Sequence, residues 1–360
     1  MKLKLALVLF TVSTLAQAQT LEESIRRYSA HVHASYAKTL KTAEELRDAI
    51  RTFTTTPSVI THEMAKAAWV NARAAYGPTE VFRFYNGPID RDGGPEGLLN
   101  AWPLDEAYID YVAGNPNAGI INNLTEFPEI TTELLIQLNE LDGEKNISTG
   151  YHAIEFLLWG QDFFVESVGQ RAFTDYTTAP NADRRAQYLN IVADLIVSEV
   201  AGLESEWRPG ENNYRREFES KPTLVAMKNL LSGIIFMAGD ELSGERMYVA
   251  YDTRGQEDEH SCFSDMTHKD IEWNFRGVEG VVSQTGILEI PVVASSPAAA
   301  RVRARLASSN KLIMSIPVPF DQAIGNEAGR DVILRSVEEL EALAKDLVDV
   351  SVLLNARVDY

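Results

Sequence analysis

The sequence predicts an all-α protein of two helical bundles. Apolar residues recur three or four positions apart along most of the 360-residue chain, which is the spacing of amphipathic helices. Strand-like alternation is nearly absent, and turn-forming residues gather in two segments, 85–103 and 251–267. A chain of this length exceeds most single cores. We therefore expect a first bundle over residues 19–180 and a second over residues 181–360.

The clearest helical pattern covers residues 183–207, where apolar residues on one face are interleaved with charged ones. The C-terminal stretch 333–354 repeats this pattern. Residues 287–290 lie between a glycine and a proline and are predicted to be extended. The other segments predicted to be helical are 21–54, 58–73, 105–112, 130–141, 151–159, 215–238, 269–281 and 298–316.

Residues 1–18 have the pattern of a cleavable secretory signal peptide. Two lysines precede an apolar run from Leu5 to Ala16, and Ala16-Gln17-Ala18 is a small-residue cleavage site. The run is too short to span a bilayer, and we expect no transmembrane segment in the mature chain. The mature protein should therefore begin near Gln19 and lie in the periplasm or cell envelope.

The charge of the mature chain argues against nucleic acid as a partner. Without Lys2 and Lys4, the 33 basic residues become 31 against 52 acidic residues, a formal charge of −21. Phosphate backbones would be repelled, whereas cations would be attracted. Cys262 is the single cysteine, so an internal disulfide and a zinc–thiolate cluster are both excluded.

The segment 150–160 carries a histidine and a glutamate three positions apart at the start of an apolar helix. Residues i and i+3 share a helix face, so His152 and Glu155 can hold one cation between them. Gly150 allows another backbone to approach closely, and the helix N-terminus favours the neutral imidazole that binds metal. The alternative is a core histidine that pairs with Glu155 for stability alone.

Three consecutive acids precede a histidine in the second irregular segment. Glu257, Asp258 and Glu259 would repel one another unless a cation or an arginine lies near them. Together with His260, these carboxylates suit Fe, Zn or Mn. A solvated charge run paired with neighbouring basic residues is the alternative.

A third polar group lies around the first irregular segment. Glu80 and Arg83 are i and i+3 partners, Trp102 is a large aromatic residue in a loop, and Asp105 follows it. These residues either line a cleft or pack and cap adjacent helices.

The chain lacks the common local motifs of hydrolases and nucleotide-binding proteins. It has no HExxH or HxxEH motif, no Gly-Xaa-Ser-Xaa-Gly elbow and no phosphate-binding P-loop. Peptidase chemistry would therefore need a ligand and a base from distant parts of the chain.

Taken together, these blocks resemble the imelysin family, in the branch called iron-regulated protein A or imelysin-like. Gly150, His152 and Glu155 match the GxHxxE motif of the family, and Phe156 to Asp162 match its FLLWGQD block. The segments FRFYNGPID, AWPLDEAYIDYV and QEDEHSCFSDMTHKDI also resemble that branch. The resemblance implies two helical-bundle domains related by a pseudo-repeat, with GxHxxE near their interface. It also implies a cell-envelope location and a link to iron uptake.

We therefore predict a protein that binds a metal ion, iron first and zinc second, or a metal complex in an interdomain cleft. One alternative is a zinc-dependent metallopeptidase, since the family takes its name from a member described as an insulin-cleaving enzyme. Another is a docking protein that grips an envelope partner without metal. The sequence leaves open whether the protein is an enzyme. The predicted metal ligands are His152, Glu155, Glu257, Asp258 and His260. The residues predicted to line the cleft are Glu80, Arg83, Trp102, Asp105, Gly150, Glu259, Ser264 and Asp265.

Overall fold

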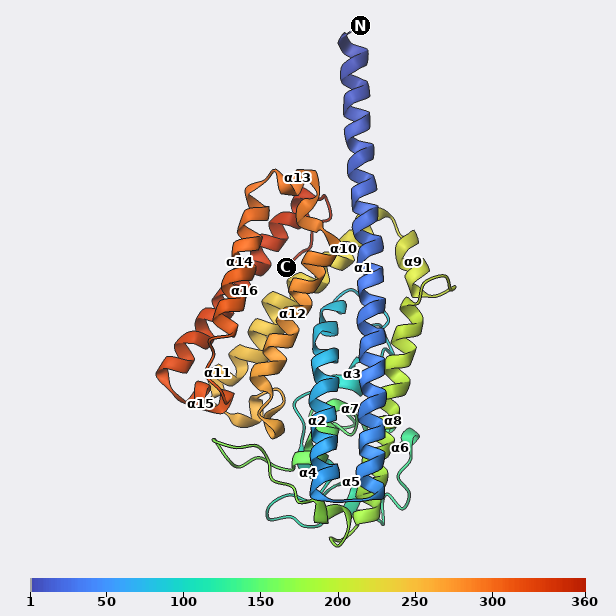
Figure 1. The fold of residues 1–360 in the computed structure, drawn as a ribbon, viewed down its shortest axis with the longest axis vertical. Helices are drawn as coiled ribbons and strands as arrows, with labels where there is room; N and C mark the ends of the chain where they lie inside the picture. The colour runs from blue at the N-terminus through green and yellow to red at the C-terminus, as the bar shows by residue number, and fades with distance from the viewer. Residues whose placement is uncertain (1) are drawn as a thin grey trace.

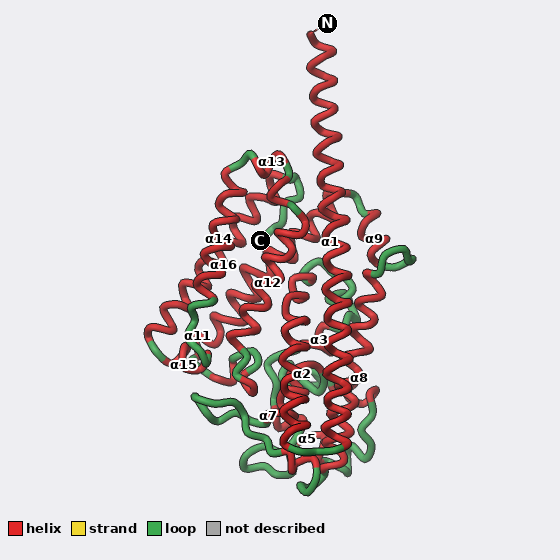
Figure 2. The backbone as a smooth tube through the Cα atoms, viewed as in Figure 1, coloured by secondary structure: helices red, strands yellow, loops and turns green. Residues whose placement is uncertain are grey.

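Helices make up 70% of the protein, and no strand forms among residues 2–360. The computed structural model describes the backbone of residues 2–360 and the side chains of residues 20–360. The predicted signal peptide at residues 1–18 lies outside the described side chains. The all-α prediction is confirmed, and Figure 2 shows helices joined by loops throughout.

The helices differ widely in length. The longest are α1 (Lys2–Thr55), α2 (Val59–Tyr76), α8 (Ala182–Trp207), α10 (Thr223–Phe236), α12 (Thr267–Thr285), α14 (Pro297–Ile313) and α16 (Glu327–Leu353). The shorter α-helices are α3 (Glu96–Asn100), α4 (Glu106–Ile109), α5 (Gly119–Asn122), α6 (Thr132–Leu138), α7 (Gly150–Trp159), α9 (Tyr214–Ser220), α11 (Val249–Thr253), α13 (Pro291–Ala294) and α15 (Phe320–Gly325). Five 3-10 helices and one π-helix complete the set: η1 (Gly77–Phe82), η2 (Phe173–Tyr176), the π-helix η3 (Met237–Tyr248), η4 (Gln256–Asp258), η5 (Cys262–Ser264) and η6 (Ile287–Glu289).

The long helices pack in two groups (Figure 1). In the first group α1 packs against α2 and α8, and in the second α16 packs against α14 and η3. Helix α12 packs against α1 of the first group and η3 of the second, so it joins the two groups, and the apolar core is continuous through them. The predicted boundary at residues 180 and 181 stays a prediction. Helix α8 lies beyond this boundary in the sequence and packs along α1.

The apolar stripe predicted on α8 faces this core. Leu189, Val192, Ile196 and Val200 are all fully buried. Each such side chain stabilises the fold by roughly 1.5–3 kcal/mol relative to leaving it in water. The 3.6-residue period of the sequence therefore decides which face of α8 meets its neighbours.

Helix α7, which carries the GxHxxE motif, is buried on every side. All ten of its residues are buried, which explains why its sequence is apolar all round. Gly150 begins the helix with φ +86°, and a Cβ built there would lie 2.7 Å from the carbonyl oxygen of Leu99. Glycine at this position therefore lets α7 start directly against α3.

The predicted helix 215–238 is two helices, the second of which runs farther than expected. Helix α9 ends at Ser220, and Pro222 then precedes α10, because proline has no N–H to donate within a helix. Helix α10 continues without a break through η3 and α11 to Thr253. The π-helical segment η3 has a wider turn than an α-helix, so residues five positions apart lie on the same side of it.

The prediction of an extended stretch at residues 287–290 is wrong. Gly286 ends α12 in the left-handed region with φ +67°, and residues Ile287–Glu289 form η6. Ile287 and Leu288 are buried in the core. No described strand offers hydrogen bonds to an extended segment here, so the backbone closes its own turn.

Two described helical stretches are long and apolar enough to cross a membrane, which the sequence analysis did not anticipate. They are Ala182–Trp207 and Thr223–Thr253. Both stretches carry a buried arginine that is paired with a carboxylate, Arg185 with Asp110 and Arg246 with Glu80. Their apolar faces pack within the protein core, which accounts for their composition.

Candidate functional site

Two buried imidazoles from distant parts of the chain meet at the centre of the site. His152 lies on α7, and His260 lies between η4 and η5. Their Nε2 atoms are 2.9 Å apart, and the exposed fractions of the two residues are 1% and 2%. The ring centroids lie 4.3 Å apart at an interplanar angle of 71°. This separation is that of an N–H···N hydrogen bond, so the two Nε2 atoms are directed at each other.

Each imidazole has a carboxylate behind it. Nδ1 of His260 lies 2.8 Å from Oδ2 of Asp270, and Nδ1 of His152 lies 2.9 Å from Oε2 of Glu155. The backbone N–H and the hydroxyl of Ser264 donate to Oε1 of Glu155, at 3.0 and 2.6 Å. A carboxylate behind an imidazole orients the ring so that Nε2 faces the opposite way, as in many metal-binding histidines.

Burial keeps both imidazoles neutral. It lowers the pKa of His152 well below its usual range, and the neighbouring His260 adds to this effect. Burial, followed by the charge of Arg246, lowers the pKa of His260 in the same direction. Burial also raises the pKa of Glu155 to about 8, although the hydrogen bond from Ser264 opposes this. Neutral imidazole is the form that binds a metal ion.

A guanidinium from η3 lies beside this pair. Arg246 donates to Nε2 of His260. It also donates to Oε2 of Glu80 and to Oε1 of Glu241, each at 2.7 Å. Glu241 and Arg246 are five residues apart, and the wider turn of the π-helix places them together. The positive charge is therefore held against His260 by two carboxylates.

A second buried arginine ties the site to α2. Arg73 is fully buried and donates to Oδ2 of Asp270 at 2.8 Å and to Oδ1 of Asn100 at 2.5 Å. Asn100 in turn donates to Oε2 of Glu80 at 3.1 Å, and Asn274 donates to Oε1 at 3.0 Å. A buried charge needs such partners, because an unpaired one is strongly destabilising. The network fixes Asp270 behind His260.

A pocket of about 290 Å³ opens beside His260 and Trp102. The ring of Trp102 lies 4.8 Å from that of His152, centroid to centroid. Two arginines and five carboxylates line the pocket, so its wall is acidic, which favours a cation over an anion. These residues are Arg83, Arg246, Glu96, Glu140, Glu241, Glu245 and Asp258.

The structure brings some of the predicted metal ligands together and separates others. His152 and His260 face each other, whereas Glu155 lies behind His152 and is held by Ser264. Asp258 lines the pocket beside His260. Glu257 is exposed and lines a different pocket of about 180 Å³.

Only some of the residues predicted to line the cleft line the main pocket. Trp102 and Arg83 line the main pocket, and Glu80 is buried behind it as a partner of Arg246. Asp105 caps α4 and faces the 180 Å³ pocket. Gly150 begins α7, and Ser264 supports Glu155. Glu259 and Asp265 do not line either pocket and belong to a separate acidic group.

Four charged residues of this site were not singled out from the sequence. Asp270 lies in the block QEDEHSCFSDMTHKDI, so a signal for it was present. Glu241 and Arg246 gave no such signal, because an i and i+5 pair does not share a face of an α-helix. Arg73 lies on α2 and reaches Asp270, which is 197 residues away in the sequence.

The fold and the site define an all-helical protein with a buried histidine–carboxylate centre under an acidic pocket. The peptidase M75 family model, described as imelysin, matches residues 32–347. The chain belongs to the imelysin family.

Relatives of this chain carry names linked to iron. Iron-regulated protein A of Synechococcus elongatus is 23% identical over 358 residues, which cover 94% of this chain and 88% of the relative. A structure from Parabacteroides distasonis, described as an iron-regulated protein A precursor, has a TM-score of 0.70 at 15% identity and covers 91% of this chain and 94% of that one. An imelysin-like protein of Psychrobacter arcticum has a TM-score of 0.68 at 14% identity, with 95% and 98% covered. The two structures support the fold.

Proposed function

We propose that this protein binds a metal ion, iron first and zinc second, through the Nε2 atoms of His152 and His260. The observation that carries the proposal is the 2.9 Å separation of these atoms, with a carboxylate behind each ring. The proposal keeps two of the five predicted metal ligands as direct ligands, His152 and His260. Glu155 orients His152 instead of binding the ion, and Glu257 is excluded because it lines a different pocket.

The donor geometry fits an ion of this kind. Two nitrogens bound to one tetrahedral ion at roughly 2.0–2.1 Å lie roughly 3.3 Å apart. The separation of 2.9 Å between His152 and His260 is a few tenths of an ångström shorter, so a small rotation of either ring makes room. When bound, the ion would supply a Lewis-acidic positive charge at the pocket wall. Asp258 lines that wall beside His260.

Arg246 must move before His260 can bind an ion. Its guanidinium donates to Nε2 of His260 in this structure, and two cations would repel each other at that distance. Glu241 holds the guanidinium from the pocket side. Release of His260 therefore means that Arg246 shifts toward Glu241 and Glu80. We infer that Arg246 competes with the ion.

The location and the link to iron are part of the same proposal. The predicted signal peptide supports export to the cell envelope, and the name of the relative from Synechococcus elongatus supports a role connected with iron. The zinc-peptidase alternative uses the same two imidazoles. The docking alternative needs no metal, and a partner of the envelope would occupy the acidic pocket instead.

Metal titration of untagged protein tests the proposal. Anaerobic Fe²⁺ and, separately, Zn²⁺ are titrated into metal-free protein by calorimetry, with Co²⁺ absorption as a probe of imidazole ligation. We expect one ion per chain, and at least tenfold weaker binding in His152→Ala and in His260→Ala. His33→Ala is the matched control, because His33 is paired with Glu204 and neither residue lines the pocket.

Equal affinity in the wild type and in both site variants would contradict the ligand assignment. Chelator-sensitive cleavage of an unfolded polypeptide, lost in the same two variants, would support the peptidase alternative. Binding of an envelope protein that persists in metal-free protein would support the docking alternative.

A further inference from the structure

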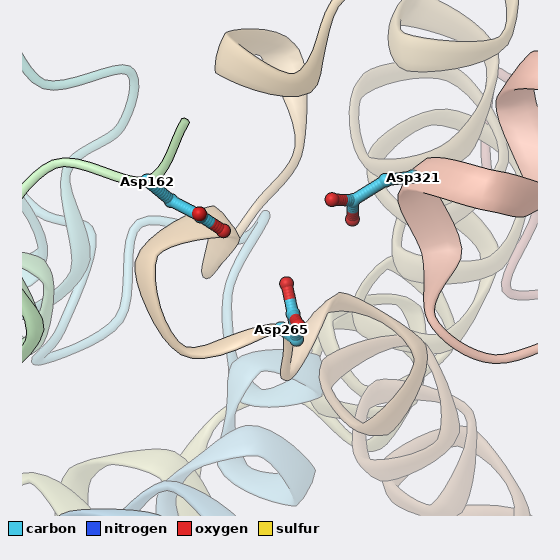
Figure 3. A group of neighbouring side chains, drawn as sticks. All are labelled: Asp162, Asp265 and Asp321. Carbon is cyan, nitrogen blue, oxygen red and sulfur yellow. The ribbon is translucent and has the colours of Figure 1, made fainter. Parts of the chain in front are cut away.

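Three aspartates converge outside the histidine pocket. Asp162 follows α7, Asp265 precedes α12, and Asp321 lies in the first turn of α15. One carboxylate oxygen from each lies within 4.8 Å of the other two. Figure 3 shows the three side chains pointing toward one another from three segments of the chain. A cluster of acidic side chains does not by itself indicate a cation site, so the groups that surround these three aspartates have to be considered.

The most buried of the three aspartates, Asp321, lacks a hydrogen-bond donor. Asp321 is 6% exposed, and neither of its carboxylate oxygens has a partner among the described residues. Its side chain points into the group in Figure 3. Glu259 is fully buried beside Asp321, and the polar groups next to its carboxyl are the carboxyl of Asp321 and the hydroxyl of Thr267. Unsatisfied buried carboxylates are strongly unfavourable, so this group requires either bound protons or a bound cation.

No described basic side chain compensates these charges. The groups that act on the four carboxylates are one another and neutral donors, such as the backbone N–H of Phe164 at 2.9 Å from Asp162. Burial, then the charge of Asp321, raises the pKa of Asp265 to about 7. Burial likewise raises the pKa of Asp162 to about 6. The four groups destabilise one another as anions.

We propose that Asp162, Asp265 and Asp321, with Glu259 beside them, bind a hard divalent cation, Ca²⁺ in particular. The donor set contains oxygen only, which selects Ca²⁺, Mg²⁺ or Mn²⁺ over softer metals. Several protein carboxylates in one group favour Ca²⁺ among these ions, because Mg²⁺ usually keeps several waters and binds only one or two carboxylates. One carboxylate oxygen from each aspartate lies within 4.8 Å of the other two, which is close enough for one ion to contact all three.

Such an ion would join three segments that are separate in the sequence. Asp162 continues the chain from the GxHxxE helix, Asp265 follows Ser264, and Asp321 belongs to the helix that packs on α16. The ion would therefore hold the loop that carries His260 and Ser264 in place. The site does not share a ligand with His152 and His260, so it stands independently of the proposed function.

Thermal unfolding of chelator-stripped protein tests this site. We expect Ca²⁺ at about 100 times Kd to raise the Tm of the wild type by roughly 3–5 °C. Asp321→Asn and Asp265→Asn should lose this shift. In chelator alone, Asp321→Asn should melt at or above the wild-type Tm, because the substitution removes like-charge repulsion. Asp92→Asn, at an exposed loop position, should keep the full shift.

The variant His152→Ala separates this site from the proposed function, because it should keep the Ca²⁺ shift. A wild-type Tm unchanged by Ca²⁺, Mg²⁺ and Mn²⁺ would overturn the proposal in favour of a carboxyl pair that shares a proton. A Ca²⁺ shift that persists in Asp321→Asn would overturn it as well. A larger shift with Mg²⁺ or Mn²⁺ would overturn the assignment to Ca²⁺.

Discussion

The Nε2 atoms of His152 and His260 lie 2.9 Å apart, although 108 residues separate them in the sequence. Each ring is oriented by a carboxylate, and each is neutral because it is buried. His260 lines an acidic pocket, and His152, which does not line it, contacts His260. This relationship underlies the proposed metal site.

Ser264→Ala should weaken metal binding about tenfold without changing the ligands. The substitution removes the 2.6 Å hydrogen bond from the Ser264 hydroxyl to Glu155, which orients His152. Calorimetric titration with Zn²⁺ measures the change. Ser309→Ala is a suitable control, since Ser309 is buried and its hydroxyl has no described partner. Wild-type affinity in Ser264→Ala would show that the hydroxyl of Ser264 does not act on His152 through Glu155.

Arg73→Ala should destabilise the protein by about 3–5 kcal/mol, because it leaves Asp270 as a buried charge without its main partner. Urea denaturation monitored by circular dichroism gives the free energy of unfolding. Arg335→Ala is the matched control, since its pair with Asp331 is exposed, and should change little. A loss below about 1 kcal/mol in Arg73→Ala would mean that Asp270 finds another partner or a proton.

Gly150→Ala should destabilise the protein by roughly 2–4 kcal/mol, because φ is +86° and the new Cβ would clash with the carbonyl of Leu99. Gly202→Ala should have the opposite sign and stabilise by roughly 0.5–1 kcal/mol. Gly202 is an exposed residue of α8 with open space around it. Thermal unfolding should give a lower Tm than the wild type for Gly150→Ala and a higher Tm for Gly202→Ala. Similar Tm values would contradict the close approach of α7 to α3.

His62 should make the protein less stable as the pH falls from 6.5 to 4. Burial lowers the pKa of His62 to about 4, so the unfolded chain takes up a proton in this window while the folded chain does not. His62→Gln keeps a donor for the carbonyl of Leu158 and should reduce the loss by up to about 3 kcal/mol. Urea denaturation at pH 7, 5.5 and 4.5 measures the slopes. Parallel slopes in the wild type and the variant would refute this account.

Much of the fold could be predicted because helical periodicity is local. The stripe on α8 and the shared face of His152 and Glu155 follow from 3.6 residues per turn. The π-helical segment could not be predicted in this way. Its wider turn pairs Glu241 with Arg246, and these positions point in different directions on an α-helix.

The candidate site was predicted only in part, and for a different reason. His260 and Asp258 were identified from their residue types, and both reach the pocket. Glu257, two positions before Glu259, is exposed instead. A short run of acids does not specify which side chains turn inward, because the irregular backbone of the 251–267 segment has no fixed period.

The sequence by itself determined the helical class of this protein, its membership of the imelysin family and the pairing of His152 with Glu155. These features depend on residues within about one helical turn or on motifs read in order. Only the tertiary structure decided that His260 meets His152, that Arg246 lies beside them and that Asp321 joins Asp162 and Asp265. Such contacts depend on how distant helices pack, and the pattern of any one segment does not specify that packing.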